Sequence, residues 1–275
     1  MAIHTTPPPI GRRRLNKRNP QQPSQTAYWH PVYRGYPIYQ QIERGPQVRD
    51  HLDRAFEYLR ALQHLHSQVF AFRVDLRFPL DVEDTALYAD NRPIRDFLKA
   101  LTQEVQRLSG QRVPALYVLW AREHNDQTRR RHVTDADLKD DEADLSKPHY
   151  HLFIAVNRDD FYRLGGFKPS YDGHYGDRSL AHAVIRGWQR VLGRDSERMR
   201  GLAHFAKCPE SGKIQTFVMR RQDGPEGLID PMKAISYLCK AYSKDTGKRL
   251  RTFQTCRIAP AIREAIWRQE RTRQG

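Results

Sequence analysis

The sequence predicts an α+β domain in which a mainly antiparallel sheet is covered by helices. Segments that alternate apolar and polar residues, which predict strands, are mixed along the chain with segments of helical spacing. Their predicted order is helix, strand, helix, strand, strand, helix, strand, helix, strand, with long-loop hairpins as well as strand-to-helix crossovers. The chain has 275 residues, of which 39% are hydrophobic, and this is enough for the core of one large domain or of one domain with tails.

The first elements belong to an N-terminal region with its own composition. Residues 1–26 contain Pro7-Pro8-Pro9 and Arg12-Arg13-Arg14, and they are expected to form a mobile, basic, proline-rich arm. This arm is either a contact for DNA phosphates or a solvated tail. Residues 27–66 are expected to form an aromatic loop and then a helix that begins near Val48. The main domain is expected over residues 67–258, and a basic helix over residues 259–275.

The first strand of the main domain has one apolar and one polar face. It is predicted over residues 69–78, where Phe70, Phe72, Val74, Leu76 and Phe78 alternate with Ala71, Arg73, Asp75 and Arg77. The aromatic and aliphatic positions form the core face. The other face is polar at three successive positions, which indicates that it looks toward water or charge.

The remaining elements follow from the same two periodicities. They are a helix over residues 94–108, strands over 115–123 and 149–156, a helix over 180–192, a strand over 213–220, a helix over 231–244 and a last strand over 251–258. A long polar loop over residues 124–147 separates two of the strands and has an acidic stretch at 135–144. That stretch lacks the Gly and Glu spacing of a calcium loop, so it is expected to be a solvated insertion.

The charge balance favours a polyanionic partner. Lys and Arg number 47 against 32 Asp and Glu, which gives a net charge of +15 at pH 7. Basic side chains release counterions from phosphates, so nucleic acid is the expected partner and a membrane is not. Because the sequence has no long apolar run, no signal-peptide core and no C-x-x-C pair, we expect a cytoplasmic protein without a membrane anchor or a structural zinc site.

A pair of histidines on one strand predicts a metal site. His149 and His151 are two residues apart, so they project from one face while Tyr150 projects from the other. Glu123 ends the preceding strand, and a hairpin through the long loop would place it beside His149. Two imidazoles and a carboxylate on adjacent strands would hold a divalent ion with open positions. The alternatives are two polar histidines on a solvated sheet face and an ordinary carboxylate at a hairpin end.

Tyr237 is the candidate nucleophile. On the helix predicted over residues 231–244, helical spacing places Tyr237 on one face with Lys233, Lys240 and Lys244. Tyr242 is turned about 140° away and is expected in the core. A free phenol has a pKa near 10, and ammonium groups around it would favour the phenolate. The alternative is a surface tyrosine in a basic patch.

These residues resemble the HUH endonucleases, the superfamily of rolling-circle replication initiators, relaxases and related transposases. The H-Y-H strand is similar to the metal motif of that family, and Tyr237-Leu-Cys-Lys240 is similar to its Y-x-x-K nucleophile motif. The His motif precedes the tyrosine, as in replication initiators. The segments W-A-R-E, H-Y-H-L-F, A-I-S-Y-L-C-K and R-T-F-Q-T-C-R look most like the replication endonucleases of filamentous phages (inoviruses) and related prophages. The resemblance covers about residues 68–257.

The resemblance implies a fold, a reaction and partners. It implies a five-stranded, RRM/ferredoxin-like antiparallel sheet, Mg²⁺ or Mn²⁺ as the ion, and single-stranded or hairpin origin DNA as the substrate. Tyr237 would attack a DNA phosphate and give a 5′-phosphotyrosine link and a free 3′-OH, while Lys240 would neutralise phosphate charge or aid deprotonation. The residues expected to contact DNA are Arg73, Asp75, Arg77, Lys233 and Lys244. No helicase-type phosphate-binding loop is visible, so a host helicase and polymerase are expected partners.

Three other functions are compatible with these patterns. A transposase acting on single-stranded DNA would use the same chemistry. A non-catalytic DNA-binding regulator of the same fold would need neither metal nor Tyr237. An RNA-binding protein is suggested by the aromatic content, and binding tests against RNA and DNA would separate it from the others.

Overall fold

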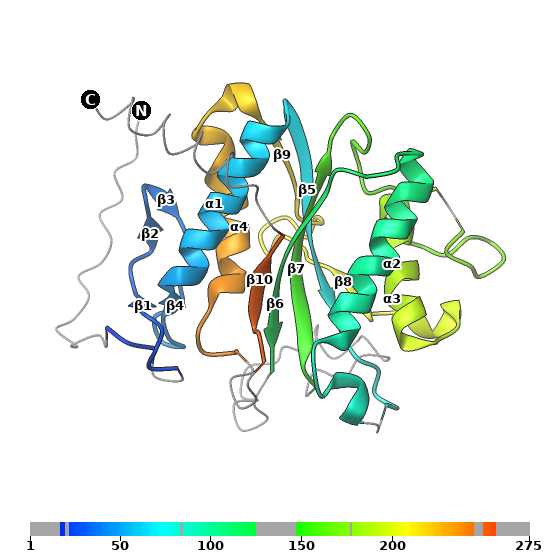
Figure 1. Ribbon diagram of the computed structural model, residues 1–275, viewed down its shortest axis with the longest axis horizontal. Helices are drawn as coiled ribbons and strands as arrows, with labels where there is room; N and C mark the ends of the chain where they lie inside the picture. The colour runs from blue at the N-terminus through cyan, green and yellow to red at the C-terminus, as the bar shows by residue number, and fades with distance from the viewer. Residues whose placement is uncertain are drawn as a thin grey trace.

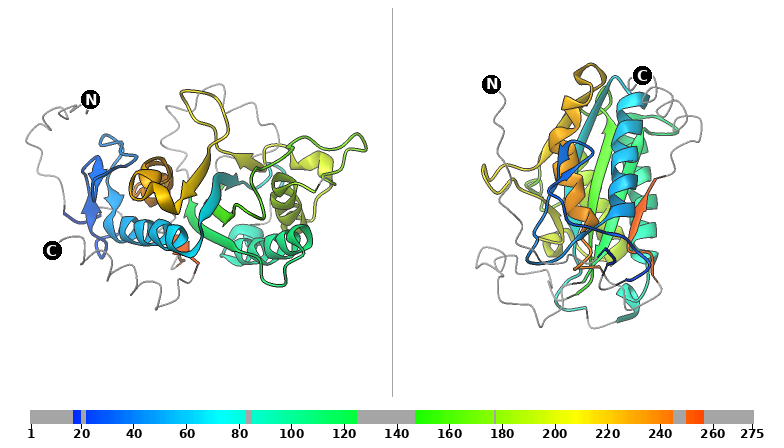
Figure 2. Two further views of the ribbon diagram at one scale, coloured as in Figure 1. Left: turned by 90° about the horizontal axis from the view of Figure 1, so that it is seen from above. Right: turned by 90° about the vertical axis from the view of Figure 1, so that its left-hand side faces the viewer.

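The computed structural model describes residues 17–19, 22–82, 85–124, 147–176, 178–244 and 250–256. Its centre is a sheet with helices on both faces (Figure 1; Figure 2, left). Within the described residues this sheet has six strands in the order β10-β6-β7-β5-β8, with β9 also paired to β5. All of its ladders are antiparallel, so the predicted α+β class with a mainly antiparallel sheet is confirmed.

The main sheet and its helices account for most of the predicted elements. The strands are β5 (Gln68–Leu76), β6 (Leu116–Glu123), β7 (His149–Asn157), β8 (Ala203–Phe205), β9 (Thr216–Arg220) and β10 (Phe253–Thr255). The helices are α1 (Arg49–Leu65), α2 (Arg92–Ser109), α3 (Leu180–Leu192) and α4 (Ile229–Ser236).

Short elements complete the described chain. Two small sheets pair β1 (Ala27–Tyr28) with β4 (Gln47–Val48) and β2 (Val32–Tyr33) with β3 (Tyr36–Pro37). The 3-10 turns are η1 (Thr85–Tyr88), η4 (Ser196–Met199), η5 (Arg221–Asp223), η6 (Glu226–Leu228) and η7 (Tyr237–Cys239). The expected arm over residues 1–26 is described only at 17–19 and 22–26. The acidic stretch at 135–144 and the helix expected over 259–275 lie outside the described residues.

The sheet has one strand more than the five that the resemblance implies. β9 pairs with residues 68–72 of β5, and β8 pairs with residues 74–76 along the same edge. The two short strands therefore lie end to end and share one position in the sheet. β8 has three residues, which is too few for an alternating pattern to be recognised in the sequence.

Alternation along the strands divides the core into two halves. Phe72 of β5 and Leu152 of β7 face α2 and α3, where Trp188 is completely buried. Ala71 and Phe153, one position away on the same strands, face α1 and α4. The sheet is therefore buried on both faces along most of its length. The buried polar side chains of its described strands lie between the middle of β5 and the end where β6 stops and β7 starts.

The helix predicted over residues 231–244 is shorter in the structure. α4 ends at Ser236, one 3-10 turn follows, and Lys240 is already extended with ψ 139°. The reason is tertiary: Lys240 forms an isolated β-bridge with Gln47, and Lys244 forms one with Glu123. Such long-range pairing overrides local helical spacing.

In the part of the chain that the structure describes, no helix is both long enough and apolar enough to cross a membrane.

A buried carboxylate joins the two helices on one face of the sheet. Glu104 of α2 is 2% exposed at its side chain and lies 2.7 Å from Arg186 and 2.5 Å from Arg190, both of α3. Arg107 approaches the same carboxylate at 3.1 Å. Although burial opposes ionisation, these guanidinium groups outweigh it and lower the pKa of Glu104. A charge held in this way fixes how α2 lies against α3.

We predict that Glu104→Gln lowers the free energy of unfolding by about 2 kcal/mol, because charge-assisted hydrogen bonds are lost from a buried position. Urea denaturation followed by circular dichroism measures the effect. Glu197→Gln is the control, since Glu197 is exposed. Equal midpoints for the two variants would contradict the assigned role of Glu104.

Candidate active site

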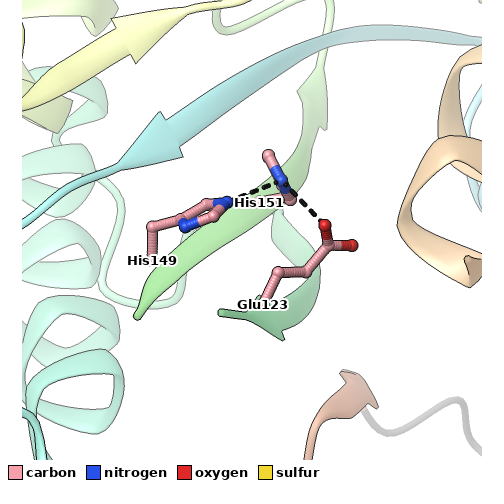
Figure 3. A group of neighbouring side chains, drawn as sticks. All are labelled: Glu123, His149 and His151. Atoms are coloured by element: carbon pink, nitrogen blue, oxygen red, sulfur yellow. Dashed lines mark hydrogen bonds and ion pairs between the residues drawn. The ribbon is translucent and has the colours of Figure 1, made fainter. Parts of the chain in front are cut away.

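The end of the sheet on the α1 and α4 face gathers three candidate metal ligands. The register between β6 and β7 places Glu123 opposite His149 and Ala121 opposite His151. Because side chains alternate along a strand, these two histidines and Glu123 project from the same face (Figure 3). The hairpin expected from the sequence is confirmed, and so is the burial of Tyr150 on the opposite face.

The donor atoms of the three side chains are close enough for one ion. The Nε2 atoms of His149 and His151 are 3.1 Å apart, and Nε2 of His151 is 3.3 Å from Oε2 of Glu123. One donor atom from each residue lies within 4.8 Å of the others, and all three residues are buried. Two ligands that bind an ion at about 2.1 Å and at right angles would be about 3.0 Å apart. The spacing of the imidazoles therefore fits a divalent ion.

Asp75 orients one of the histidines. Its Oδ1 lies 2.5 Å from Nδ1 of His151. An ionised carboxylate only accepts hydrogen bonds, so Nδ1 carries the proton, and Nε2 is the atom that faces Glu123 and His149. Metal-binding histidines commonly have this carboxylate partner on the other ring nitrogen. The donor set and its support thus fit a resident divalent cation.

The sequence assigned Asp75 to a DNA-contacting face, and the structure gives it a different position. Asp75 is 9% exposed and lies directly opposite His151 in the ladder between β5 and β7. Its side chain is engaged by that histidine, with Arg73 3.9 Å away. The sequence did contain a signal for this role, because Asp75 is a polar residue on the polar face of a strand that could pair with the H-x-H strand.

The two histidines have opposite electrostatics. Burial lowers the pKa of His149, and the neighbouring His151 lowers it further, to about 3. Burial also disfavours a charged His151, but Asp75 and Glu123 outweigh it and raise the pKa of His151 to about 9. At neutral pH the first ring is therefore neutral and the second carries a proton that a metal ion must displace.

Glu123 is held by the chain segment that follows Tyr237. Lys240 Nζ lies 2.9 Å from Oε2, Lys244 Nζ lies 2.9 Å from Oε1, and the Ser243 hydroxyl donates to Oε2 at 2.6 Å. Burial opposes ionisation of Glu123, but the two ammonium groups outweigh it and hold its pKa well below the usual range. An ion bound through Oε2 would share that oxygen with Lys240 and Ser243.

Of the three lysines expected around Tyr237, Lys240 does lie against its ring. The expectation of an exposed helix face that continues through Lys240 and Lys244 is wrong. Lys233 is exposed, but Lys240 and Lys244 are only 4% and 6% exposed. Lys244 also donates to the Leu238 carbonyl at 2.6 Å, so its cation is directed inward. An exposed face through Lys240 and Lys244 would require a helix that continues to residue 244, but α4 ends at Ser236.

Tyr237 is half-buried and lies against the candidate metal ligands. Its ring centroid is 5.1 Å from that of His151, in an edge-to-face arrangement. Lys240 Nζ is 3.5 Å from the ring centroid, and the Arg73 guanidinium carbon is 4.3 Å from it. The Lys240 cation is the largest of the influences that lower the pKa of Tyr237, and burial opposes it.

The other expected residues are placed as follows. Arg73 is buried beside Tyr237, and its Nε has no hydrogen-bond partner among the residues that the structure describes. Arg77 is half-exposed just beyond the end of β5. Tyr242 is half-buried rather than in the core, and its hydroxyl lies 3.3 Å from Oε1 of Gln41.

Fold and site together define an α+β protein with a candidate metal centre beside a tyrosine. The chain belongs to the YagK/YfjJ C-terminal domain family, whose model matches residues 30–135 and 138–256. It is 24% identical to "Uncharacterized protein YagK" of Escherichia coli (strain K12) over 229 residues, which are 78% of this chain and 95% of the relative. It is 26% identical to "Uncharacterized protein YfjJ" of the same strain over 227 residues, 77% of this chain and 95% of the relative. No solved structure matches it.

We predict that the affinity for Mn²⁺ rises by about tenfold per pH unit between pH 6.5 and 8.5, because one proton on His151 competes with the ion below its pKa. That pKa is about 9, while His149, with a pKa of about 3, adds no further proton. Titration of free Mn²⁺ by electron paramagnetic resonance gives the dissociation constants. His149→Ala/His151→Ala is the control and should lose saturable binding. An affinity that does not change with pH would contradict the protonated His151.

We predict that Asp75→Asn weakens Mn²⁺ binding by about tenfold to a hundredfold, because the supporting carboxylate of a metal-binding histidine is lost. Calorimetric titrations at several pH values, fitted for proton competition at His151, give the pH-independent affinity that measures the change, because loss of Asp75 also relieves that competition. The matched control is Asp96→Asn, since Asp96 is exposed on α2. If both variants bind the ion as the unmodified protein does, Asp75 has no part in metal binding.

Proposed function

We propose that this protein is a metal-dependent DNA-nicking and joining enzyme of the HUH superfamily that starts rolling-circle replication of a phage, prophage or plasmid. The observation that carries the proposal is the position of Tyr237, whose ring lies edge-to-face with His151, one of the candidate metal ligands. A nucleophile beside a divalent cation is the arrangement that phosphoryl transfer to a side chain requires. The net charge of +15 suits a DNA substrate.

The proposed reaction exchanges one phosphate ester for another. The phenol oxygen of Tyr237 attacks the scissile phosphorus and forms an O–P bond, while the bond from phosphorus to the 3′ oxygen breaks. The phenol gives up its proton to water and the departing 3′ oxygen takes one up from water, so the net charge is unchanged. The product is a 5′-phosphotyrosine link with a free 3′-OH that can prime synthesis. Attack by a 3′-OH reverses the steps and rejoins the strand.

Two cations of the chain would act on the reacting groups. Burial lowers the pKa of Lys240, but Glu123 and Tyr237 outweigh it and raise the pKa above its ordinary value. Lys240 therefore stays protonated and would stabilise the phenolate and the phosphate rather than remove a proton. Arg73 lies over the same ring, and its Nε has no hydrogen-bond partner within the described part of the chain, so this nitrogen would be available to a phosphate oxygen.

His149, His151 and Glu123 would hold Mg²⁺ or Mn²⁺, and the bound ion would supply Lewis-acid polarisation of the scissile phosphate. The chain's own contribution is to keep Nε2 of His151 directed at that position through Asp75. Arg77 and Lys233 remain proposed contacts for single-stranded or hairpin origin DNA, and a host helicase and polymerase remain proposed partners.

One observation favours a second function. Lys240 and Lys244 already balance the buried charge of Glu123, so this carboxylate does not require a metal ion for its stabilisation. A DNA-binding regulator of the same fold would need no more than this. The two functions differ in whether a covalent protein–DNA adduct forms.

We predict a covalent adduct with single-stranded DNA in the presence of Mn²⁺. Oligonucleotides tiled across the replicon that carries the gene, including its hairpins, are incubated with the protein and separated on a denaturing gel. Tyr237→Phe and His149→Ala/His151→Ala should abolish the protein-linked band, because the nucleophile or the metal ligands are gone.

Tyr242→Phe is the matched control for this assay. It removes a neighbouring phenol that hydrogen-bonds to Gln41 and should leave the band in place. Tight binding of DNA without an adduct on any oligonucleotide would instead establish the regulator. An adduct that survives Tyr237→Phe would mean that another residue is the nucleophile.

A further inference from the structure

The chain segment around Tyr237 is held by residues that lie about two hundred positions earlier in the sequence. The backbone N–H of Tyr39 donates to Oγ of Ser236 at 2.8 Å, immediately before Tyr237. After it, Gln47 forms a β-bridge with Lys240, and the N–H of Ala241 donates to the Pro46 carbonyl at 3.0 Å. Residues 39–47, here called the strap, therefore fix the backbone on both sides of Tyr237.

Two further contacts keep the strap close. The Gln47 side-chain amide donates to the Tyr39 carbonyl, which ties the two ends of the strap together. Gly45 has φ +143°, and a Cβ added there would come within 3.2 Å of Tyr242. Only glycine allows both this backbone conformation and this approach. The strap therefore has a backbone conformation that packs closely against the segment around Tyr237.

The strap is anchored in the core rather than lying loosely on the surface. Just before it, Tyr33, Tyr36 and Ile38 are buried in the cluster that also contains residues of α1 and α4. The rings of Tyr33 and Tyr36 both contact Phe56 of α1, at centroid distances of 6.5 and 5.6 Å. The position of Tyr39 is therefore determined by the folded domain.

One side chain of the strap reaches the candidate nucleophile directly. The Tyr39 ring lies edge-on to the Tyr237 ring, with centroids 4.9 Å apart and planes at 65°. His151, Lys240 and Arg73 also contact this ring. Tyr39 is the neutral side chain among these neighbours, and it comes from a part of the chain that carries no candidate ligand.

We propose that Tyr39 is a positioning residue, which holds the Tyr237 ring against His151 so that its phenol oxygen is aimed at the scissile phosphate. This inference rests on the proposed nicking function. Edge-to-face packing needs the Tyr39 ring and not its hydroxyl. Without the ring, Tyr237 gains freedom to rotate, and small displacements of a nucleophile are costly to the rate.

Tyr39→Ala is expected to lower the single-turnover rate of adduct formation by about tenfold to a hundredfold at saturating DNA and Mn²⁺. Tyr39→Phe should restore the rate to within about threefold of the unmodified protein, because the ring is retained. The affinity for Mn²⁺ should be unchanged in both variants, since the Tyr39 ring packs on Tyr237 and not on a candidate metal ligand. Tyr28→Ala is the matched control, as Tyr28 is half-buried in the same region and contacts His30 and Tyr33 instead.

A second measurement does not depend on activity. With 3-fluorotyrosine incorporated at position 237, the fluorine resonance should shift or broaden in Tyr39→Ala but not in Tyr39→Phe or Tyr28→Ala. If Tyr39→Ala does not fold, Tyr39→Leu takes its place, with the same expected loss of rate and change of resonance.

The outcomes separate this inference from the function on which it rests. A rate for Tyr39→Ala equal to that of Tyr28→Ala overturns the inference, whether or not the resonance moves. A rate that falls equally in Tyr39→Phe also overturns it, because the hydroxyl would then be what matters. Absence of any adduct with the unmodified protein defeats the proposed function, whereas an unchanged resonance in Tyr39→Ala defeats the positioning role on its own.

Discussion

The burial of the Glu123 carboxylate determines how the candidate site is built. A carboxylate with 1% exposure must be compensated within the protein, because an unpaired buried charge costs several kcal/mol. Lys240 and Lys244 supply the compensation, and to do so the chain after Tyr237 leaves the helix and runs along the end of β6. Because Lys240 and Lys244 pair with Glu123, the chain cannot continue as a helix beyond the end of α4, and both ammonium groups point inward. The same path of the chain places Tyr237 beside His151.

The antiparallel register of three strands brings the charged groups into one cluster, in which Glu123 lies opposite His149 and diagonal to His151. Asp75 of β5 lies opposite His151 of β7, and Glu123 of β6 lies on the other side of that histidine. One imidazole is thus set between two carboxylates, which is why it retains a proton at neutral pH while His149 does not. The apolar residues of the same strands are buried against helices on both faces, so the core holds the strands that carry this cluster.

The features that the sequence predicts correctly are those that depend on local periodicity. The alternating strands, the amphipathic helices and the shared face of His149, His151 and Glu123 follow from spacing alone. The inward Lys244, the support from Asp75 and the strap at Tyr39 depend on partners far away in the chain, which no periodic pattern encodes. β8 is missed because three residues carry too little pattern. The predicted exposure of Lys240 and Lys244 was wrong because helical spacing was continued past the point where tertiary pairing ends the helix.

The contacts of the strap with the segment around Tyr237 also bear on the order in which the domain folds. Synthesis proceeds from the N-terminus, so Tyr39, Gln47 and Glu123 leave the ribosome well before Tyr237 does. Their pairings with residues 236–244 span most of the chain and close the longest loops of the domain, which makes them late and slow to form. A chain truncated before residue 236 lacks these pairings, and the tyrosine site is therefore assembled only after the strands β5 to β9 have been synthesised.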